Sequence, residues 1–94
     1  MTSRSKLTPE VSKQFKKDLK RSRKQGRDIT SLRTLMEKLT SQENLDSKYR
    51  DHALGGNWKG YRDCHVKPDW LLIYCISSLT IRFERLGSHS ELFG

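Results

Sequence analysis

The chain has 94 residues and a mass of 11.0 kDa, and only 33% of its residues are hydrophobic, so it has room for one small domain with a modest core. Its 19 Lys and Arg residues outnumber its 11 Asp and Glu residues, and the excess lies entirely in residues 1–50, where the ratio is 14 to 6, against 5 to 5 in residues 51–94. The longest apolar run, Trp70 to Ile76, is too short to cross a membrane and Met1 to Lys6 shows no secretory signal, so we expect a cytoplasmic protein without a membrane partner.

Residues 8–42 are predicted to form a helical part made of two amphipathic helices. Thr8 is suited to cap the first helix, with Pro9 in its first turn, and Gly26 is suited to end it. Asp28 is suited to cap the second helix. Apolar residues recur at helical spacing in both, namely Val11, Phe15 and Leu19 in the first and Ile29, Leu32, Leu35, Met36 and Leu39 in the second. The short connection predicts a helical hairpin.

The first helix is strongly basic, with eight basic residues and one acidic residue in residues 13–27. Such a run is either an ordinary solvated face or a surface that docks on a polyanion, most often a nucleic acid, and we favour docking. The residues predicted to dock are Lys13, Lys16, Lys17, Lys20, Arg21, Arg23 and Lys24.

Residues 43–60 lack periodicity and contain a Gly-Gly-Asn sequence, so we expect a loop there. Residues 61–94 are predicted to form the β-sheet part of the same domain, with strands at residues 61–66, 70–76 and 79–86. The middle strand is apolar throughout and should be covered on both faces, and Gly87 should end the last strand before a short tail. Short linkers predict an antiparallel meander. The expected fold class is therefore α+β, an N-terminal helical hairpin packed on a small twisted antiparallel β-sheet.

Side chains suited to RNA chemistry are concentrated in the charge-balanced half, which holds all three histidines, His52, His65 and His89. Cleaving RNA through its own 2′-hydroxyl without a metal requires a base, an acid and a cation beside the phosphate. Histidine can act as acid or base near neutral pH, and arginine offers a charged fork to phosphate oxygens, which makes Arg62, Arg82 and Arg85 candidates. Surface or structural histidines are the competing interpretation, because residue counts alone do not establish catalysis.

Other residues in this half have both structural and functional interpretations. Trp70 adjoins the apolar strand and could pack in the core or stack on an unpaired base. Arg85 has the parity of the apolar residues of its strand, so either it lies beyond the core rim or a β-bulge re-aims it. Cys64 and Cys75 are expected to be reduced thiols. Because no ligand pair has zinc-finger spacing, we expect no metal and no cofactor.

Three separated motifs resemble those of the YafQ toxins of the RelE superfamily. They are Asp51 to Gly56 (DHALGG), Trp58 to Tyr74 (WKGYRDCHV followed by PDWLLIY) and Arg82 to Phe93 (RFERLGSHSELF). The match is dense from Lys48 onward and is limited to layout and apolar pattern before it. Ala53 departs from the Pro often found after the Asp-His pair.

The resemblance implies the toxin of a bacterial type II toxin–antitoxin system, a ribosome-dependent endoribonuclease that cuts mRNA codons in the A site without a metal. It assigns acid–base work to His52, His65, Asp69 and His89, phosphate contact to Arg85, and positioning of the codon to Trp70 and Phe93. We place Arg62 with the substrate-binding residues. Which group is the general base and which the general acid stays open, because coupled groups in one pocket share their titration. The family fold also implies a short first strand near Ser5 to Leu7.

The expected partners follow from the same resemblance. They are a cognate antitoxin in a heterotetrameric complex, the 70S ribosome with its rRNA, and mRNA. The antitoxin segment that binds the basic surface should be acidic and disordered until bound. We expect little cleavage of free RNA, because the ribosome supplies the orientation of the codon. The alternative function is a non-catalytic RNA- or ribosome-binding module, and a third is a toxin-like relative that acts on another target.

Overall fold

In the computed structural model, which describes residues 5–94, one strand is followed by two α-helices, four further strands and a third α-helix. They are β1 (Thr8–Val11), α1 (Lys13–Lys24), α2 (Ile29–Thr40), β2 (His52–Ala53), β3 (Arg62–Lys67), β4 (Trp70–Ser77), β5 (Thr80–Gly87) and α3 (His89–Phe93). Two 3-10 turns, η1 (Ser47–Tyr49) and η2 (Gly56–Trp58), flank β2. The strands form one sheet in the order β1-β5-β4-β3-β2. The α+β class is confirmed, but the sheet is mixed rather than antiparallel, because β1 pairs with β5 in parallel.

The segment predicted to begin the first helix, Thr8 to Val11, is an edge strand, so this prediction is wrong. The backbone N–H of Ser12, just after the strand, donates to the carbonyl of Phe83 at 3.0 Å. Pro9 is tolerated because an outermost strand can turn a position without an N–H away from the sheet. Helix α1 then begins at Lys13, with the Ser12 hydroxyl as its cap. The strand implied near Ser5 to Leu7 lies a few residues later.

The remainder of the helical hairpin agrees with the prediction. Gly26 follows α1 with a positive φ of 75°, and Asp28 caps α2 by accepting the N–H of Ser31 at 3.1 Å. Both helices pack against one face of the sheet. The buried residues that join them to it are Phe15, Leu32, Leu35 and Leu39 from the helices and Cys64, Leu72, Tyr74, Ile81, Phe83 and Leu86 from the strands.

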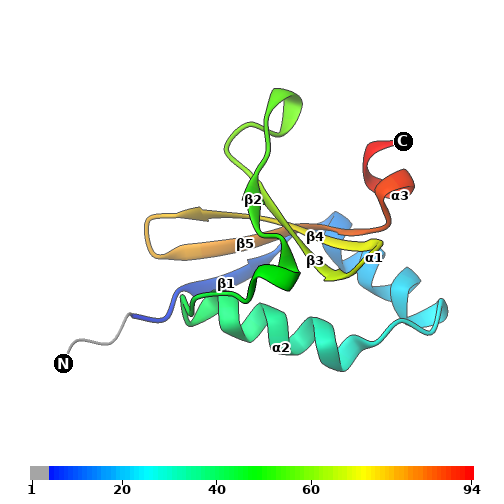
Figure 1. Cartoon of the computed structure of the whole chain (residues 1–94), viewed down its shortest axis with the longest axis horizontal. Coiled ribbons are helices and arrows are strands. Elements are labelled where there is room, and N and C mark those ends of the chain that lie inside the picture. The colour runs from blue at the N-terminus through cyan, green and yellow to red at the C-terminus, as the bar shows by residue number, and fades with distance from the viewer. Residues whose placement is uncertain (1–4) are drawn as a thin grey trace.

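The predicted C-terminal tail is a short helix, α3, which lies on the other face of the sheet. Ser88 and Glu91 form a reciprocal capping box at its start. A Ser followed three residues later by a Glu is a sequence signal for the start of a helix. Leu92 packs on Leu71 and Ile73 of β4. Figure 1 shows α2 below the sheet, with α3 and the loop after β2 standing above it. The apolar run of β4 is therefore covered on both faces, as predicted.

Helix α1 takes the place of a neighbouring strand along the C-terminal half of β5, which β1 does not reach. The hydroxyl of Ser12 donates to the carbonyl of Glu84 at 2.7 Å. Asp18 accepts the N–H of Leu86 at 3.0 Å, and Arg21 donates to the carbonyl of Leu86 at 2.9 Å. Side chains of the basic helix thus satisfy the open backbone groups of this strand.

Candidate active site

Four residues form one row across the sheet because they pair in turn from β2 to β5: His52, Asp63, Ile73 and Arg85. In the next row, His65 of β3 pairs with Leu71 of β4. Residues directly opposite each other project from the same face. Leu71 and Ile73 pack beneath α3, so this face, which we call the site face, is the one opposite α1 and α2. It brings together His52, His65 and Arg85, which were predicted as catalytic.

A β-bulge places Arg85 on the site face. Ile73 lies opposite Arg85 and Tyr74 lies opposite Phe83, so Glu84 is an extra residue in β5. The extra residue reverses the alternation of the strand, which leaves Phe83 in the core and Arg85 on the opposite face. Of the two alternatives for Arg85, the structure shows the bulge.

His89 and Asp69 form the best-defined contact of the site. Asp69 lies in the turn between β3 and β4, and its Oδ1 is 2.7 Å from His89 Nδ1 and 3.0 Å from the His89 backbone nitrogen. These hydrogen bonds hold the pKa of Asp69 below its usual value, so the carboxylate is ionised near neutral pH. An ionised carboxylate only accepts, so Nδ1 of His89 carries a proton and Nε2 is the nitrogen left to face a substrate. The His65 ring lies edge-on to His89, with 5.6 Å between ring centroids.

His52 is oriented from the opposite end of the site. Its Nδ1 lies 2.7 Å from the carbonyl oxygen of Arg50 and 3.3 Å from Asp63 Oδ1. A carbonyl can only accept, so Nδ1 carries the proton, and neutral His52 has an unprotonated Nε2. Arg50 adopts the left-handed conformation with φ 48° and ψ 42°, which is uncommon for a residue with a side chain. That conformation turns its carbonyl toward His52.

Asp63 belongs to the site although no role was predicted for it. It is 4% exposed and lies among the histidines, and burial raises the pKa of its carboxyl while positive charge on His52, His65 or His89 lowers it. Its Oδ1 accepts no hydrogen bond from the residues that the structure describes, so His52 at 3.3 Å is its nearest charge partner. The signal was present, because Asp63 stands two residues before His65 in a strand, which puts both on one face.

Aromatic rings form a wall beside His89. Phe93 of α3 is 44% exposed, with its ring centroid 6.4 Å from His89 and 6.5 Å from Trp58. Trp58 in turn meets Tyr61 edge-on at 5.3 Å. Phe93 therefore lies beside His89, and Trp58 and Tyr61 extend the wall.

Trp70 lies in the core and does not take part in this site. Its side chain is 0% exposed, and its indole N–H donates to Ser22 Oγ of α1 at 3.3 Å. The Arg27 guanidinium carbon lies 5.6 Å from the ring centroid. Because protein atoms enclose the ring, its predicted stacking on a base does not fit this structure, and the structural interpretation of Trp70 is the one observed.

Arg62 points to the wrong face for the predicted contact with RNA. It stands next to Asp63 in β3 and therefore projects toward the helices. Its Nη2 lies 3.2 Å from Asp51 Oδ2, and the Tyr74 hydroxyl donates to the same carboxylate. Hydrogen bonding to Asp51 is the largest cause of the raised pKa of Arg62. This cluster anchors the residue immediately before His52 rather than binding substrate.

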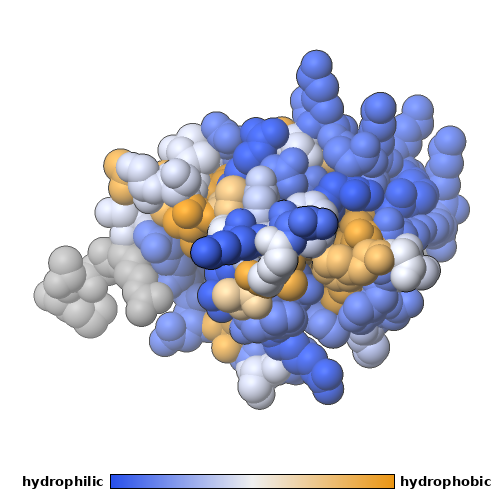
Figure 2. Space-filling view, turned by 90° about the horizontal axis from the view of Figure 1, so that it is seen from above, coloured by the Kyte–Doolittle hydropathy of each residue, from blue (hydrophilic) through white to orange (hydrophobic). Residues whose placement is uncertain are grey.

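Six of the seven predicted docking residues are exposed on α1, namely Lys13, Lys16, Lys17, Lys20, Arg23 and Lys24. Among residues 5–94, none of the six is in an ion pair with a carboxylate. Figure 2 views the molecule from above, and long hydrophilic side chains project from the side on which α1 and α3 lie in Figure 1. Arg21 differs, because it is committed to contacts with Asp18, Leu86 and Glu91 inside the protein.

A basic cleft of about 560 Å³ adjoins His65. Its lining includes the cations Lys48, Arg50 and Lys67 and the ring of Tyr49, and no carboxylate lines it among the described residues. Lys67 also lies 3.7 Å from Asp28, at an exposed position where such a pair is weak. The cleft therefore offers positive charge beside one of the clustered histidines.

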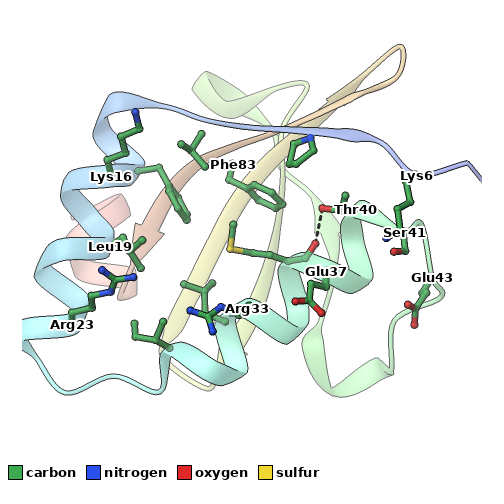
Figure 3. A pocket seen from close by; sticks show the side chains of 16 residues that line it. Lys6, Lys16, Leu19, Arg23, Arg33, Glu37, Thr40, Ser41, Glu43 and Phe83 are labelled. Carbon is green, nitrogen blue, oxygen red and sulfur yellow. Dashed lines mark hydrogen bonds between the residues drawn. The ribbon is translucent and has the colours of Figure 1, made fainter.

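A second hollow lies between β1, α1 and α2. This groove has a volume of about 790 Å³. Figure 3 shows Leu19 and Phe83 toward its inside, with Arg23 and Arg33 near one end. Further apolar lining comes from both helices, and Lys6 and Lys16 add positive charge at the rim. It is an apolar groove with a mainly basic border.

Within residues 5–94, no three His, Cys, Asp or Glu side chains are arranged to hold a metal ion. Cys64 and Cys75 are both free thiols. Burial is the main cause that raises the pKa of each, which favours the protonated form. No helix in the described part of the chain is long and apolar enough to span a bilayer.

Comparison with known proteins identifies close relatives across nearly the whole chain. Residues 7–94 match the family described as bacterial toxin of type II toxin–antitoxin system, YafQ. The mRNA interferase toxin YafQ of Escherichia coli K12 is 48% identical over 86 residues, which cover 90% of this chain and 94% of that protein. The crystal structure of YafQ from E. coli BL21(DE3) superposes with a TM-score of 0.90 at 45% identity, covering 94% of this chain and 99% of that chain.

YafQ has also been solved with a partner protein. The crystal structure of the E. coli DinJ–YafQ complex contains a chain that matches this one with a TM-score of 0.87 at 46% identity. The match covers 94% of this chain and 99% of that chain.

Proposed function

The chain belongs to the YafQ family of bacterial type II toxin–antitoxin toxins, and from that premise we propose that it is a ribosome-dependent endoribonuclease that cuts mRNA in the A site without a metal. The observation that carries this proposal is the gathering of His52, His65, His89 and Arg85 around one face of the sheet. Nucleophile and leaving group both belong to the RNA, so the protein has to supply proton transfer and charge stabilisation.

The hydrogen bonds of His52 and His89 favour the roles of general base and general acid, respectively. His52 presents Nε2 without a proton when neutral, and this suits the base that removes the proton of the 2′-hydroxyl. The resulting oxygen attacks the phosphorus and displaces the 5′-oxygen, leaving a 2′,3′-cyclic phosphate. His89, with the ionised carboxylate of Asp69 as counterion when it is positively charged, suits the acid that protonates the leaving oxygen.

In this proposal, His65 and Arg85 would contact the phosphate that is cut between His52 and His89. His65 follows Asp63 by two positions, about 7 Å along β3, and its ring contacts His89. Arg85 would hold the non-bridging oxygens and stabilise the additional negative charge of the transition state. Phe93, and with it Trp58, offers exposed aromatic surface for an unstacked base.

The surrounding charge supports a single-stranded RNA path. The basic cleft beside His65 would take the backbone on one side of the cut, and the exposed cations of α1 would contact rRNA. This division assigns docking to the first half of the chain and cleavage to the second.

The groove between β1, α1 and α2 suits an antitoxin. Its apolar lining and the border cations Lys6, Lys16, Arg23 and Arg33 complement a segment that is apolar on one side and acidic on the other. The relative of known structure binds DinJ. We assign the groove to an acidic antitoxin segment that folds as it binds, in a heterotetrameric complex.

Mapping of cut sites on mRNA in translating 70S ribosomes tests the enzymatic proposal. Wild type should cut within or beside the A-site codon, and His89→Ala and His52→Ala should not. Thr34→Ala, an exposed change on α2 on the other side of the sheet, is the matched control and should behave as wild type. Rapid, unselective digestion of naked RNA by wild type would contradict ribosome dependence.

The alternative is a non-catalytic ribosome-binding module, which the unpaired cations of α1 would serve equally well. Growth arrest separates the two. If His89→Ala and His52→Ala arrest growth as strongly as wild type on induction, binding alone accounts for the effect. If wild type cuts a different RNA instead, the protein is a toxin-like relative with another target.

A further inference from the structure

We propose that Asp18, on the basic helix α1, is a positioning residue that fixes the direction of the Arg85 guanidinium for RNA cleavage. The inference rests on the proposed function and deepens it. The two residues are 67 positions apart, and Asp18 is the single acid in residues 13–27, the basic run that was predicted to dock.

The side chain of Asp18 is 0% exposed, and it accepts hydrogen bonds from residues of β5 and of α1. Its Oδ2 accepts from Arg85 Nε at 2.8 Å and from the backbone N–H of Leu86 at 3.0 Å. Its Oδ1 lies 3.5 Å from Arg85 Nη2 and accepts from Gln14 Nε2 at 3.1 Å, with Arg21 Nη1 at 3.3 Å. Burial raises the pKa of Asp18, but the hydrogen bonds from Arg85, Leu86 and Gln14 outweigh it and leave the pKa below its usual value.

The geometry of the pair determines which edge of the guanidinium is free. Asp18 occupies the edge formed by Nε and Nη2 of Arg85. The guanidinium is a rigid planar fork, so binding one edge sets the plane and direction of the other. The Nη1 end, for which the structure shows no bond to a described residue, is left for phosphate oxygens.

A buried carboxylate is a poor choice if stability is the only requirement. Removing a carboxylate from water is costly, and apolar residues often stabilise such a position equally well. Here one oxygen, Oδ2, binds both the Arg85 side chain and the next backbone N–H of the bulged strand. Because this one oxygen binds both groups, the Arg85 guanidinium is held in a fixed orientation relative to the bulged backbone of β5.

Asp18 also reaches the helix that carries His89. Arg21 lies between Asp18 and Glu91, with Nη1 3.3 Å from Asp18 Oδ1 and Nε 3.3 Å from Glu91 Oε2. Glu91 caps the first turn of α3. Asp18 therefore contacts Arg85 directly and α3 through Arg21.

A double-mutant cycle measures whether Asp18 acts through Arg85. Single-turnover cleavage of mRNA in the ribosomal A site is followed for wild type, Asp18→Asn, Arg85→Ala and the double variant. We expect Asp18→Asn to lower the maximal rate about 10-fold or more, with an unchanged half-saturating ribosome concentration. A loss of this size is comparable to that caused by removing one hydrogen-bond donor to the transition state. In the Arg85→Ala background, the same change should alter the rate less than about 2-fold. The control is Asp28→Asn, which removes an exposed carboxylate. The asparagine that replaces it can still cap α2 through its side-chain oxygen.

Arg85→Lys provides a second variant that does not depend on how well Asp18→Asn folds. Lysine keeps the charge but cannot bind Asp18 along one edge and phosphate along another, so it should lose nearly as much rate as Arg85→Ala. The Nε–H resonance of Arg85 in a ¹⁵N NMR spectrum reports the contact directly, and Asp18→Asn should shift it and speed its exchange with solvent.

Three results would overturn the inference while leaving the proposed function intact. They are a folded Asp18→Asn protein with the wild-type rate, an equal loss of rate in the presence and absence of Arg85, or an Arg85→Lys protein with nearly full activity. A wild-type protein that cuts no ribosome-bound mRNA would instead remove the proposed function, and the inference with it.

Discussion

The Oδ1 atom of Asp69 holds both the ring and the backbone of His89, at 2.7 Å from Nδ1 and 3.0 Å from the backbone nitrogen. One carboxylate oxygen in the turn between β3 and β4 therefore sets the tautomer of His89 and the position of the first residue of α3. Asp69 is exposed, so its substitution should disturb this contact more than the fold.

Asp69→Asn tests this contact. The amide oxygen can still accept the backbone N–H of His89, but the negative charge next to the imidazole is lost. We expect the single-turnover rate to fall roughly 10- to 100-fold, as for a weakened general acid, with little change in the midpoint of thermal unfolding. Asp46→Asn, at the exposed cap of η1, should leave the rate unchanged. A wild-type rate for Asp69→Asn would show that the carboxylate has no part in proton transfer.

Gly87→Ala should disrupt the packing between α1 and α3. A Cβ at position 87 would lie 2.8 Å from Arg21 Nη2 and 3.0 Å from Glu91 Oε1, within the ion pair that joins the two helices. Such overpacking costs about 1–3 kcal/mol, measurable in urea unfolding, and displacement of α3 should also slow cleavage. Gly55→Ala is the matched control, because its Cβ would have no atom within 4 Å. Equal stability of the two variants would contradict this account of Gly87.

Replacing Lys16, Lys17 and Lys20 together by Gln should weaken ribosome binding and its dependence on salt. If all three contact rRNA phosphates, the slope of log affinity against log salt should fall by roughly 2 to 3. Lys59→Gln is the control, an exposed charge in the loop before β3. Arg21 is left out of the set because its contacts are internal. An unchanged slope would mean that the basic helix docks on something other than rRNA.

The contribution of Asp18 to stability should depend on pH in one direction. Its pKa in the folded protein lies below the usual value, which is about 3.9 when the chain is unfolded. The stabilisation is therefore complete above about pH 4 to 5 and is lost as the pH falls through the lowered pKa. Urea unfolding of wild type and Asp18→Asn should differ by about 2–3 kcal/mol near pH 7. The difference should shrink below about pH 4. A difference that grows on acidification would contradict the lowered pKa.

Trp70→Phe distinguishes a core residue from one that stacks on RNA. Phenylalanine keeps a buried ring but loses the hydrogen bond to Ser22 and part of the indole volume, so we expect cleavage within about 2-fold of wild type and a loss of about 1–3 kcal/mol in stability. Phe93→Ala should do the opposite, raising the half-saturating ribosome concentration with little effect on unfolding. A large loss of rate in a stable Trp70→Phe protein would return Trp70 to the site.

Local pattern in the sequence was enough for the elements whose partners are nearby. The apolar run of β4, the cap at Asp28 and the stop at Gly26 are all confirmed, because each reflects hydrogen bonding or burial within a few residues. The motifs from Asp51 onward also led to the correct family. The histidines and Arg85 were predicted together for the same reason, but the common face that His52, His65 and Arg85 share is visible only in the structure.

The tertiary structure decided every feature that depends on a distant partner. Thr8 and Pro9 have the local features of a helix start, yet the open edge of β5 pairs with them and makes a strand. One extra residue in β5 determines the face of Arg85, and adjacent positions in β3 separate Asp63 from Arg62. Asp18 and Arg21 carry charges that resemble their solvated neighbours in the sequence, but Asp18 is buried against β5, and Arg21 is half-buried between β5 and α3. The cause is common to all these cases: backbone groups and buried charges must be satisfied, and the groups that satisfy them come from parts of the chain that only folding brings near.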